Sequence, residues 1–186
     1  MKGAGALSFG YYCQIGLMRR DALKVLLLAA ALLAPPSAWP ATRHPLLGQP
    51  AVDFALRSVA GTNVRLSEYR GDVVLLSFWG SRCGQCLPQL AALDRLQATY
   101  GSAGLVTLGV NVDDDQAAAR DFAGGRHVGF AMLLDPSKSV ARSYRVDALP
   151  SVVLVDRAGV IREVFREFRS GAEDEYLTRI KALLDE

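Results

Sequence analysis

The segment from Val73 to Gln89 constrains the fold more than any other part of the chain. Its first part, Val73–Phe78, is an unbroken apolar and β-branched run, which predicts a strand that is buried on both faces. Gly80 interrupts this run, and from Cys86 onward the apolar residues recur at helical spacing. The sequence therefore predicts a buried strand, a short loop and a helix, with Cys83 at or just before the N-terminus of that helix and Cys86 one turn further in.

The two cysteines of this segment, Cys83 and Cys86, form a Cys-x-x-Cys motif. The unpaired backbone N–H groups and the dipole of a helix N-terminus favour negative charge, so the Cys83 thiol should ionise more readily than a free cysteine. A second thiol three residues further on can reach back to the first, which lets a disulfide open and close in place. The motif therefore predicts a redox-active disulfide as the reacting group, without any other cofactor.

Two other roles for the motif stay open from the residues alone. Half of a zinc site is one, but residues 42–186 hold no second cysteine pair, and His44 and His127 are not spaced as a ligand pair. A static structural disulfide is the other, although closing so small a loop constrains the unfolded chain very little. The third cysteine, Cys13, lies upstream without the sequence context of lipid attachment, and we assign it no role. Redox chemistry is favoured, and no metal is expected.

Residues 1–41 have the features of an export leader. Met18–Lys24 supplies a basic segment, Val25–Ala34 is an unbroken apolar run, and small residues follow up to Ala38. The apolar run is shorter than the roughly 20 residues of an ordinary membrane span. The sequence therefore predicts export to the periplasm or cell envelope, with Met18 as a candidate for the true start. A short uncleaved anchor, which would tether the protein to the membrane, is the alternative.

Composition limits what the remaining chain, residues 42–186, can be. The 186 residues are 51% hydrophobic and 22% charged, as expected for one domain with a packed core. The formal net charge of +2 becomes −1 without residues 1–41, because these hold four basic side chains and one acidic one. No basic patch therefore indicates nucleic acid or anionic lipid as a partner.

Strand and helix signals alternate along residues 42–186 and end in a hairpin followed by a helix. The expected strands cover 53–56 and 63–66 (a hairpin around Gly61), 73–78, 105–112, 131–134, the end of 146–156, and 160–168 as an exposed edge. The expected helices start at or just after Cys83, cover 116–122, cover 137–144 with Pro136 opening the helix, and follow a capping box at 170–173. A helical turn at 66–71 is expected to be capped by Ser67. Three successive aspartates, Asp113–Asp115, are expected to cap the helix over 116–122 rather than to bind a metal. This order predicts an α/β fold with helices flanking a mixed central sheet.

Several short motifs occur in a characteristic order. They are Phe78–Trp79 ahead of the Cys83/Cys86 pair, Asn111–Asp113, Leu149–Ser151, and Asp156 with Gly159. Together they resemble exported thioredoxin-fold proteins of the TlpA/ResA type, in the AhpC/TSA–redoxin superfamily, over roughly residues 50–184. The resemblance implies a thioredoxin-like fold with an N-terminal hairpin and an inserted strand–helix unit, for which residues 105–124 are the candidate.

The resemblance also implies which residues shape the site. Cys83 and Cys86 would be the catalytic pair, with Trp79 ahead of them. Pro150 would follow a cis peptide bond beside the cysteines, and the backbone of Leu149 could then pair with an extended substrate segment. An ordinary trans proline at the start of a strand is the alternative from the residues alone.

The sequence departs from the family pattern around the motif. Gly84 and Gln85 separate the cysteines, where proline is common at the second place. The buried acid of the family would fall at Ser77 or Gln89, and neither side chain can accept and release a proton at neutral pH. The sequence therefore predicts a site without the usual internal proton carrier for Cys86.

The residue before the first cysteine is Arg82, where tryptophan is usual in the family. A guanidinium beside Cys83 should favour the thiolate and make the disulfide a better oxidant. Alternatively, Arg82 points into solvent and contributes little.

These features predict a thiol–disulfide oxidoreductase of the cell envelope that reduces disulfides of exported proteins. Cys83 would attack the substrate disulfide, and Cys86 would then release the product. The resemblance implies that a membrane-embedded thiol donor re-reduces the pair. It also implies exported proteins as substrates, with apocytochrome c as one candidate.

Three other functions are weighed against this one. A thiol peroxidase would need Thr or Ser three residues before its reactive cysteine, where this chain has Gly80. A copper chaperone of the Sco type would need a longer cysteine spacing and a histidine, for which His127 is the candidate. A non-catalytic binding module would keep the disulfide static.

Overall fold

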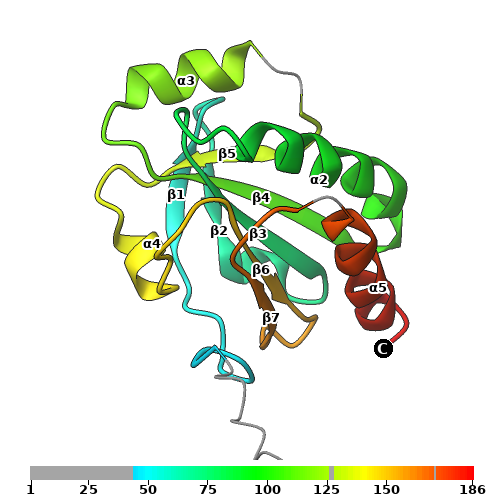
Figure 1. Ribbon diagram of the computed structural model, residues 1–186. Coiled ribbons are helices and arrows are strands. Elements are labelled where there is room, and N and C mark those ends of the chain that lie inside the picture. Colours follow the sequence, from blue (N-terminus) through cyan, green and yellow to red (C-terminus); the bar gives the residue numbers. More distant parts are fainter. Residues whose placement is uncertain (1–43, 126–127, 170) are drawn as a thin grey trace, which may run out of the picture. The chain divides into compact units, whose positions relative to one another are not determined.

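A mixed sheet of seven strands forms the centre of the described chain, in the order β2-β1-β5-β4-β3-β6-β7 (Figure 1). The structure is a computed structural model that describes residues 44–125, 128–169 and 171–186. Its strands are β1 (Ala55–Ser58), β2 (Asn63–Arg65), β3 (Val73–Trp79), β4 (Leu105–Asn111), β5 (Ala131–Leu134), β6 (Ser151–Val155) and β7 (Ile161–Phe165). Its helices are α2 (Cys86–Tyr100), α3 (Gln116–Gly124), α4 (Ser139–Ser143) and α5 (Ala172–Leu184), with 3-10 turns η1 (Leu66–Tyr69) and η2 (Gly101–Ala103).

The leader proposed for residues 1–41 lies outside the described residues. Across the described ranges, every helix falls short of the length and apolarity that spanning a bilayer requires.

Strand β3 lies in the middle of the sheet with both of its faces covered. All of its side chains are buried, and it pairs in parallel with β4 and antiparallel with β6. The prediction of a strand buried on both faces in a mixed sheet is confirmed. The parallel register sets Trp79 opposite Asn111, so β3 and β4 end at the same edge of the sheet. The loop that carries the cysteines starts from this edge.

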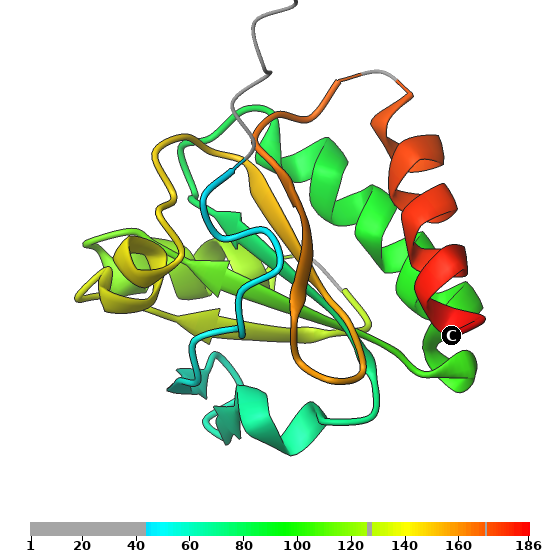
Figure 2. The same cartoon turned by 90° about the horizontal axis from the view of Figure 1, so that it is seen from below.

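Helices cover both faces of the sheet (Figures 1 and 2). Helices α2 and α5 lie side by side on one face, where Leu93 and Ile180 pack against Leu75 of β3. Helix α3 also packs through apolar residues against the end of β3. On the opposite face, Tyr144 at the end of α4 packs on Phe78, with ring centroids 5.7 Å apart. Alternate side chains of β3 therefore supply the two apolar cores.

The predicted hairpin and the strand–helix run over 105–124 are present, but the first hairpin strand, β1, covers Ala55–Ser58 rather than 53–56. Strands β1 and β2 pair antiparallel around Gly61, whose φ of +89° is one that glycine adopts readily. Strand β1 also pairs with β5, which joins the hairpin to the sheet. The run over 105–124 forms β4 and α3.

The predicted start of the helix over 137–144 was wrong. Helix α4 covers only Ser139–Ser143, and Pro136 lies in the turn before it. The fully buried carboxylate of Asp135 accepts hydrogen bonds from the backbone N–H groups of Ser139 (3.0 Å) and Ala141 (2.9 Å). Asp135 therefore ties the first turn of α4 to the end of β5, and the proline does not open the helix.

Two other predicted caps also differ in the structure. The helical turn η1 has Arg65 at its N-cap, and Ser67 instead donates from its backbone and hydroxyl to Asp53 (2.9 and 3.1 Å). Helix α5 follows Gly171 as its N-cap, and Glu173 pairs with Arg95 of α2. Ser170 of the predicted capping box lies outside the described residues.

Strand β7 is an edge strand, as predicted, but it ends at Phe165 rather than at residue 168. Residues 48–51 lie along its first part. The backbone of Ile161 accepts a hydrogen bond from Gly48 (2.8 Å) and donates one to Gln49 (2.9 Å). Part of this edge is therefore already paired within the chain.

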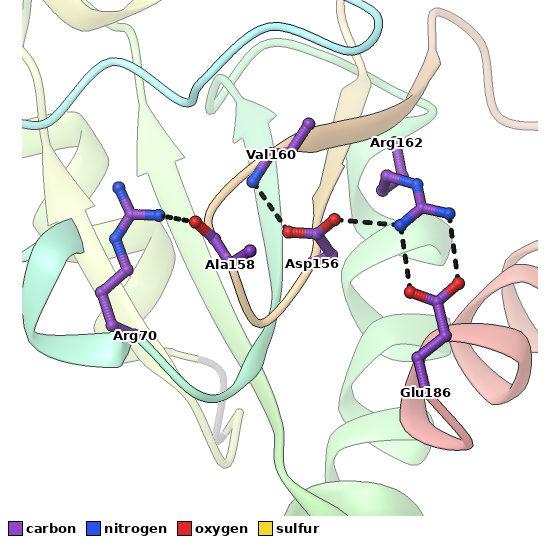
Figure 3. A network of polar contacts seen from close by, with 6 residues as sticks. All are labelled: Arg70, Asp156, Ala158, Val160, Arg162 and Glu186. Atoms are coloured by element: carbon purple, nitrogen blue, oxygen red, sulfur yellow. Dashed lines mark hydrogen bonds and ion pairs between the residues drawn. The ribbon is translucent and has the colours of Figure 1, made fainter.

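The turn between β6 and β7 is held by a network of polar contacts (Figure 3). The Asp156 carboxylate accepts from the Val160 N–H (2.8 Å) and from Arg162 (3.0 Å), which also pairs with Glu186. Arg70 donates to a backbone carbonyl of the same turn. Burial alone would raise the pKa of Asp156, but the hydrogen bonds from Val160 and Arg162 outweigh it, so the pKa is lowered. The network joins the β6–β7 turn to the residues that follow α5 and to the chain before β3.

Candidate active site

The two cysteines form a disulfide between the end of β3 and the start of α2. Their Cα atoms are 5.3 Å apart. The Cys83 N–H donates to Gly80 O (3.1 Å), and the Cys86 N–H donates to Cys83 O (3.1 Å), so two successive turns carry the chain from the strand into the helix. Cys83 lies just before the helix, as predicted, but Cys86 is its first residue and not one turn inside it. The thiols therefore lie on the turn that opens α2.

The two sulfur-bearing residues differ in exposure. Cys83 is half-buried, whereas Cys86 is fully buried against Leu90 and the residues around it. Gly84 and Gln85, which separate them, are both exposed. An incoming thiol or disulfide can therefore reach this pair from the side of Cys83.

The Leu149–Pro150 peptide bond is cis, as the resemblance implied. Pro150 is buried, and Leu149 is half-buried and packs on the apolar cluster that contains Trp79 and Cys86. A Cβ atom at Gly80 would lie 3.2 Å from Leu149 Cδ1, so the two loops are in close contact. The structure thus brings the proline loop beside the cysteine loop.

Trp79 packs in the same apolar cluster as the two cysteines. It is fully buried, and its ring stacks on Phe122 of α3 with centroids 5.0 Å apart. The same cluster holds Cys86 and Leu90. Trp79 therefore packs helix α3 against the base of the cysteine helix.

A chain of neutral polar groups runs behind the disulfide. Ser77 Oγ donates to Gln89 Oε1 (3.0 Å), and Gln89 Nε2 donates to Tyr176 Oη (3.1 Å). All three side chains are fully buried. Ser77 and Gln89, the two positions at which the family acid was expected, are therefore in direct contact, and no carboxylate takes part in their hydrogen bonds.

Tyr176 of α5 was not predicted as part of the site. Burial raises the pKa of its phenol, and the hydrogen bond from Gln89 offsets only part of that effect. The group therefore stays protonated at neutral pH and takes no proton from a thiol. Its spacing with Ile180 and Leu183 at i, i+4 and i+7 marks it as core-facing, but the sequence does not indicate which side chain it meets.

Arg82 is exposed and forms no ion pair with any described residue. This position favours the alternative in which the guanidinium points into solvent. Its effect on Cys83 stays a prediction, because solvent screens an exposed charge.

Replacing Arg82 with tryptophan should raise the pKa of Cys83 by no more than about half a unit, since an exposed charge gives weak support to a thiolate. The measurement is the pH titration of thiolate absorbance in the reduced protein. The matched control is Arg82→Lys, which keeps the positive charge and should keep the wild-type pKa. Identical titrations of all three proteins would show that Arg82 does not influence the ionisation of Cys83.

The three successive aspartates have three different roles, so the prediction that all of them cap α3 was wrong. Only Asp115 is the cap, accepting from the N–H groups of Ala117 (2.9 Å) and Ala118 (3.2 Å). Asp114 pairs with Lys138 at the surface. Asp113 instead accepts a hydrogen bond from the Ser81 N–H (2.8 Å), in the loop that carries Cys83. It is a second site residue that the sequence did not indicate.

No group of three or more His, Cys, Asp or Glu side chains in the described ranges is arranged to hold a metal ion. His44 lies in the described part at the N-terminal end, and His127, the candidate ligand for copper, lies outside it.

Several known proteins with similar sequences are named thiol-disulfide oxidoreductases. Residues 47–164 match the AhpC/TSA family. The thiol-disulfide oxidoreductase ResA of Geobacillus kaustophilus (strain HTA426) is 32% identical over 118 residues, which cover 63% of this chain and 68% of the relative. The thioredoxin-like protein YneN of Bacillus subtilis (strain 168) is 31% identical over 120 residues, with 63% and 69% covered.

Solved structures agree with the fold. A Chlorobium tepidum protein described as a candidate thiol:disulfide interchange protein DsbE has a TM-score of 0.72 and 33% identity, covering 74% of this chain and 97% of that one. The exposed lipoprotein thioredoxin Etrx1 of Streptococcus pneumoniae strain TIGR4 has a TM-score of 0.65 and 29% identity, covering 71% and 100%. These matches confirm the predicted thioredoxin-like fold and disulfide oxidoreductase class. The chain belongs to the AhpC/TSA family and, within it, to the thiol-disulfide oxidoreductases.

Proposed function

We propose that the chain reduces disulfide bonds of exported proteins in the cell envelope, using Cys83 and Cys86 as its reactive dithiol. The observation that carries the proposal is the unequal exposure of the pair at the start of α2, beside the loop of Leu149 and Pro150. Because Cys86 is fully buried, Cys83 is the thiol that a protein substrate can meet.

The reaction has two exchange steps. The Cys83 thiolate attacks one sulfur of the substrate disulfide, forming a mixed disulfide, and the other substrate sulfur leaves as a thiolate and takes up a proton. Cys86 then loses its proton and attacks the Cys83 sulfur, which releases the second substrate sulfur as a thiolate, and this thiolate takes up the second proton. The substrate disulfide has gained two electrons and two protons, and Cys83–Cys86 has become a disulfide.

The proton of Cys86 has to leave without a nearby carboxylate. The buried side chains behind the pair, Ser77, Gln89 and Tyr176, are all neutral hydrogen-bonding groups. We infer that water or the departing substrate thiolate accepts this proton. If water accepts it, the second step should slow as the pH falls, whereas direct transfer to the departing thiolate should leave the rate independent of pH.

Substrate binding is assigned to the proline loop. Leu149 is half-buried next to the loop of Gly80, and its backbone can pair with an extended segment of the substrate as an added strand does. A membrane-embedded thiol donor would re-reduce the pair, because an oxidising compartment does not do so by itself. The resemblance of the sequence motifs to the TlpA/ResA type makes apocytochrome c one substrate to test.

The reduction potential of the Cys83–Cys86 pair, measured in the purified protein at equilibrium with glutathione buffers, tests the proposal. A reductase is expected to have a value near the −270 mV of thioredoxin, whereas a strong oxidant such as DsbA lies at about −120 mV. The companion measurement is catalysed reduction of insulin disulfides with dithiothreitol as the electron source. If the Cys83–Cys86 pair stays oxidised under moderate reductant and the protein does not catalyse insulin reduction, the disulfide is structural and the proposal is overturned.

A further inference from the structure

The Asp113 carboxylate joins the end of β4 to the loop that carries the cysteines. Its Oδ2 atom accepts hydrogen bonds from the Ser81 N–H (2.8 Å) and from Asn111 Nδ2 (2.8 Å). The Asp113 N–H in turn donates to Asn111 Oδ1 (3.0 Å). The side chain is therefore fixed by its own strand end and reaches across to the cysteine loop.

The contact falls on the turn that places Cys83. That turn closes with the hydrogen bond from the Cys83 N–H to Gly80 O (3.1 Å), and Ser81 is its second residue. A Cβ atom at the buried Gly80 would lie 3.0 Å from Asp113 Oδ1 and 3.2 Å from Leu149 Cδ1. Asp113 and the proline loop thus both approach Gly80 closely. Among the described side chains, Asp113 alone hydrogen-bonds to the backbone of residues 80–85.

We propose that Asp113 positions Cys83 and that the negative charge of Asp113 disfavours the Cys83 thiolate. The pair is therefore more reducing than it would be if only the helix N-terminus acted on Cys83. The proposal rests on the proposed function. The carboxylate of Asp113 lies on the side of Cys83, the more exposed cysteine. The buried groups behind Cys86 are all neutral.

The charges around the cysteine loop support an electrostatic effect of Asp113. Its two hydrogen-bond donors, the Ser81 N–H and the Asn111 amide, are neutral, so they leave the carboxylate charge uncompensated. Of the cations that share its surface hollow, Lys138 is paired with Asp114, and Arg82 is exposed. Asp115 adds a further negative charge there, but its carboxylate caps α3. A half-buried charge that is bound to the loop of a thiol shifts the ionisation of that thiol more than an exposed charge at a similar distance does.

The experiment compares Asp113→Asn with Asp114→Asn in the full chain. Both changes remove one negative charge from neighbouring positions, but only the first removes it from the side chain that binds the cysteine loop. Asp113→Asn keeps an oxygen for the Ser81 N–H and should lower the pKa of Cys83 by about half a unit to one unit. The glutathione equilibrium at pH 7 should then shift about two- to fivefold towards the dithiol, because a more acidic Cys83 stabilises the reduced form. Asp114→Asn frees the exposed Lys138 and should shift both values in the same direction, but by a small fraction of the change in Asp113→Asn.

The anchoring role has its own readout. Asp113→Ala removes the acceptor as well as the charge, and amide hydrogen exchange at Ser81 should become about tenfold faster than in wild type, whereas Asp113→Asn should keep most of the protection. Unchanged exchange in the alanine variant would overturn the anchoring. Equal Cys83 titrations in Asp113→Asn and Asp114→Asn would overturn the electrostatic role. A wild-type pair that does not exchange with glutathione at all would instead refute the proposed function, and the two failures are thereby distinguished.

Discussion

Replacing Cys83 with serine should lower the rate of substrate disulfide reduction by at least about a thousandfold, because this residue is the reachable member of the pair and supplies the attacking sulfur. Cys86→Ser should behave differently. It keeps the attacking thiol and loses the group that resolves the intermediate, so it should accumulate mixed disulfides with substrate proteins. Non-reducing gel electrophoresis followed by mass spectrometry of the trapped bands measures both outcomes.

The full chain contains a third thiol that has to be controlled. Cys13 should be replaced by serine in every protein of the series, so that only the motif can form a cross-link. Wild-type turnover in this background is the reference. If Cys83→Ser traps partners and Cys86→Ser does not, the assigned order of attack is reversed.

Gln89→Glu should destabilise the protein by about 4 kcal/mol at pH 8 while leaving its stability in acid close to that of wild type. The substitution preserves the size and shape of a side chain that is fully buried between Ser77 and Tyr176. A protonated carboxyl can make similar hydrogen bonds. The carboxylate, in contrast, would lie in a site where none of these neighbours carries a positive charge, so burial should raise its folded-state pKa by about three units.

The destabilisation by Gln89→Glu should grow as the pH rises. The carboxyl of a glutamate in the unfolded chain titrates near 4.3. Between this value and the raised folded-state pKa, the folded protein binds more protons than the unfolded one, so the free energy of unfolding falls by about 1.4 kcal/mol per pH unit. Above the folded-state pKa the loss stays constant.

Urea unfolding at a series of pH values from about 4 to 8 measures this loss. The matched control is Gln85→Glu, the same change at an exposed position on the N-cap of the same helix, which should show no such loss. If Gln89→Glu were as stable as wild type at pH 8, the space behind the disulfide would have to admit water or a counter-charge, and the account of a closed neutral chain would be wrong.

The sequence indicated the parts of the site whose signals are local. A β-branched apolar run followed by glycine and a Cys-x-x-Cys motif predicted β3, the loop and α2, because burial and helix periodicity act over a few neighbouring residues. The cis bond before Pro150 came from the family resemblance rather than from the residue pattern. What the sequence missed are contacts across long chain separations.

Asp113 and Tyr176 illustrate this limit. Asp113 stands among three aspartates before a helix, a pattern that indicates capping, yet its partner Ser81 is contributed by a different loop. Tyr176 shares the apolar periodicity of its helix, and nothing local shows that its hydroxyl meets Gln89 on α2. In both cases the partner is set by how β3 and β4, or α2 and α5, pack together. Single-sequence patterns carry no information about such pairs.

The pairing of residues 48–51 with the first part of β7 has a practical consequence for any shortened form of the protein. A chain trimmed to begin at Val52 would leave the backbone groups of Ile161 unpaired at the side of the sheet. Open backbone of this kind recruits strands from other molecules and promotes aggregation. A truncated version made for crystallisation or for redox titration should therefore retain the chain from His44 onward, even though these residues are remote in sequence from the strand that they shield.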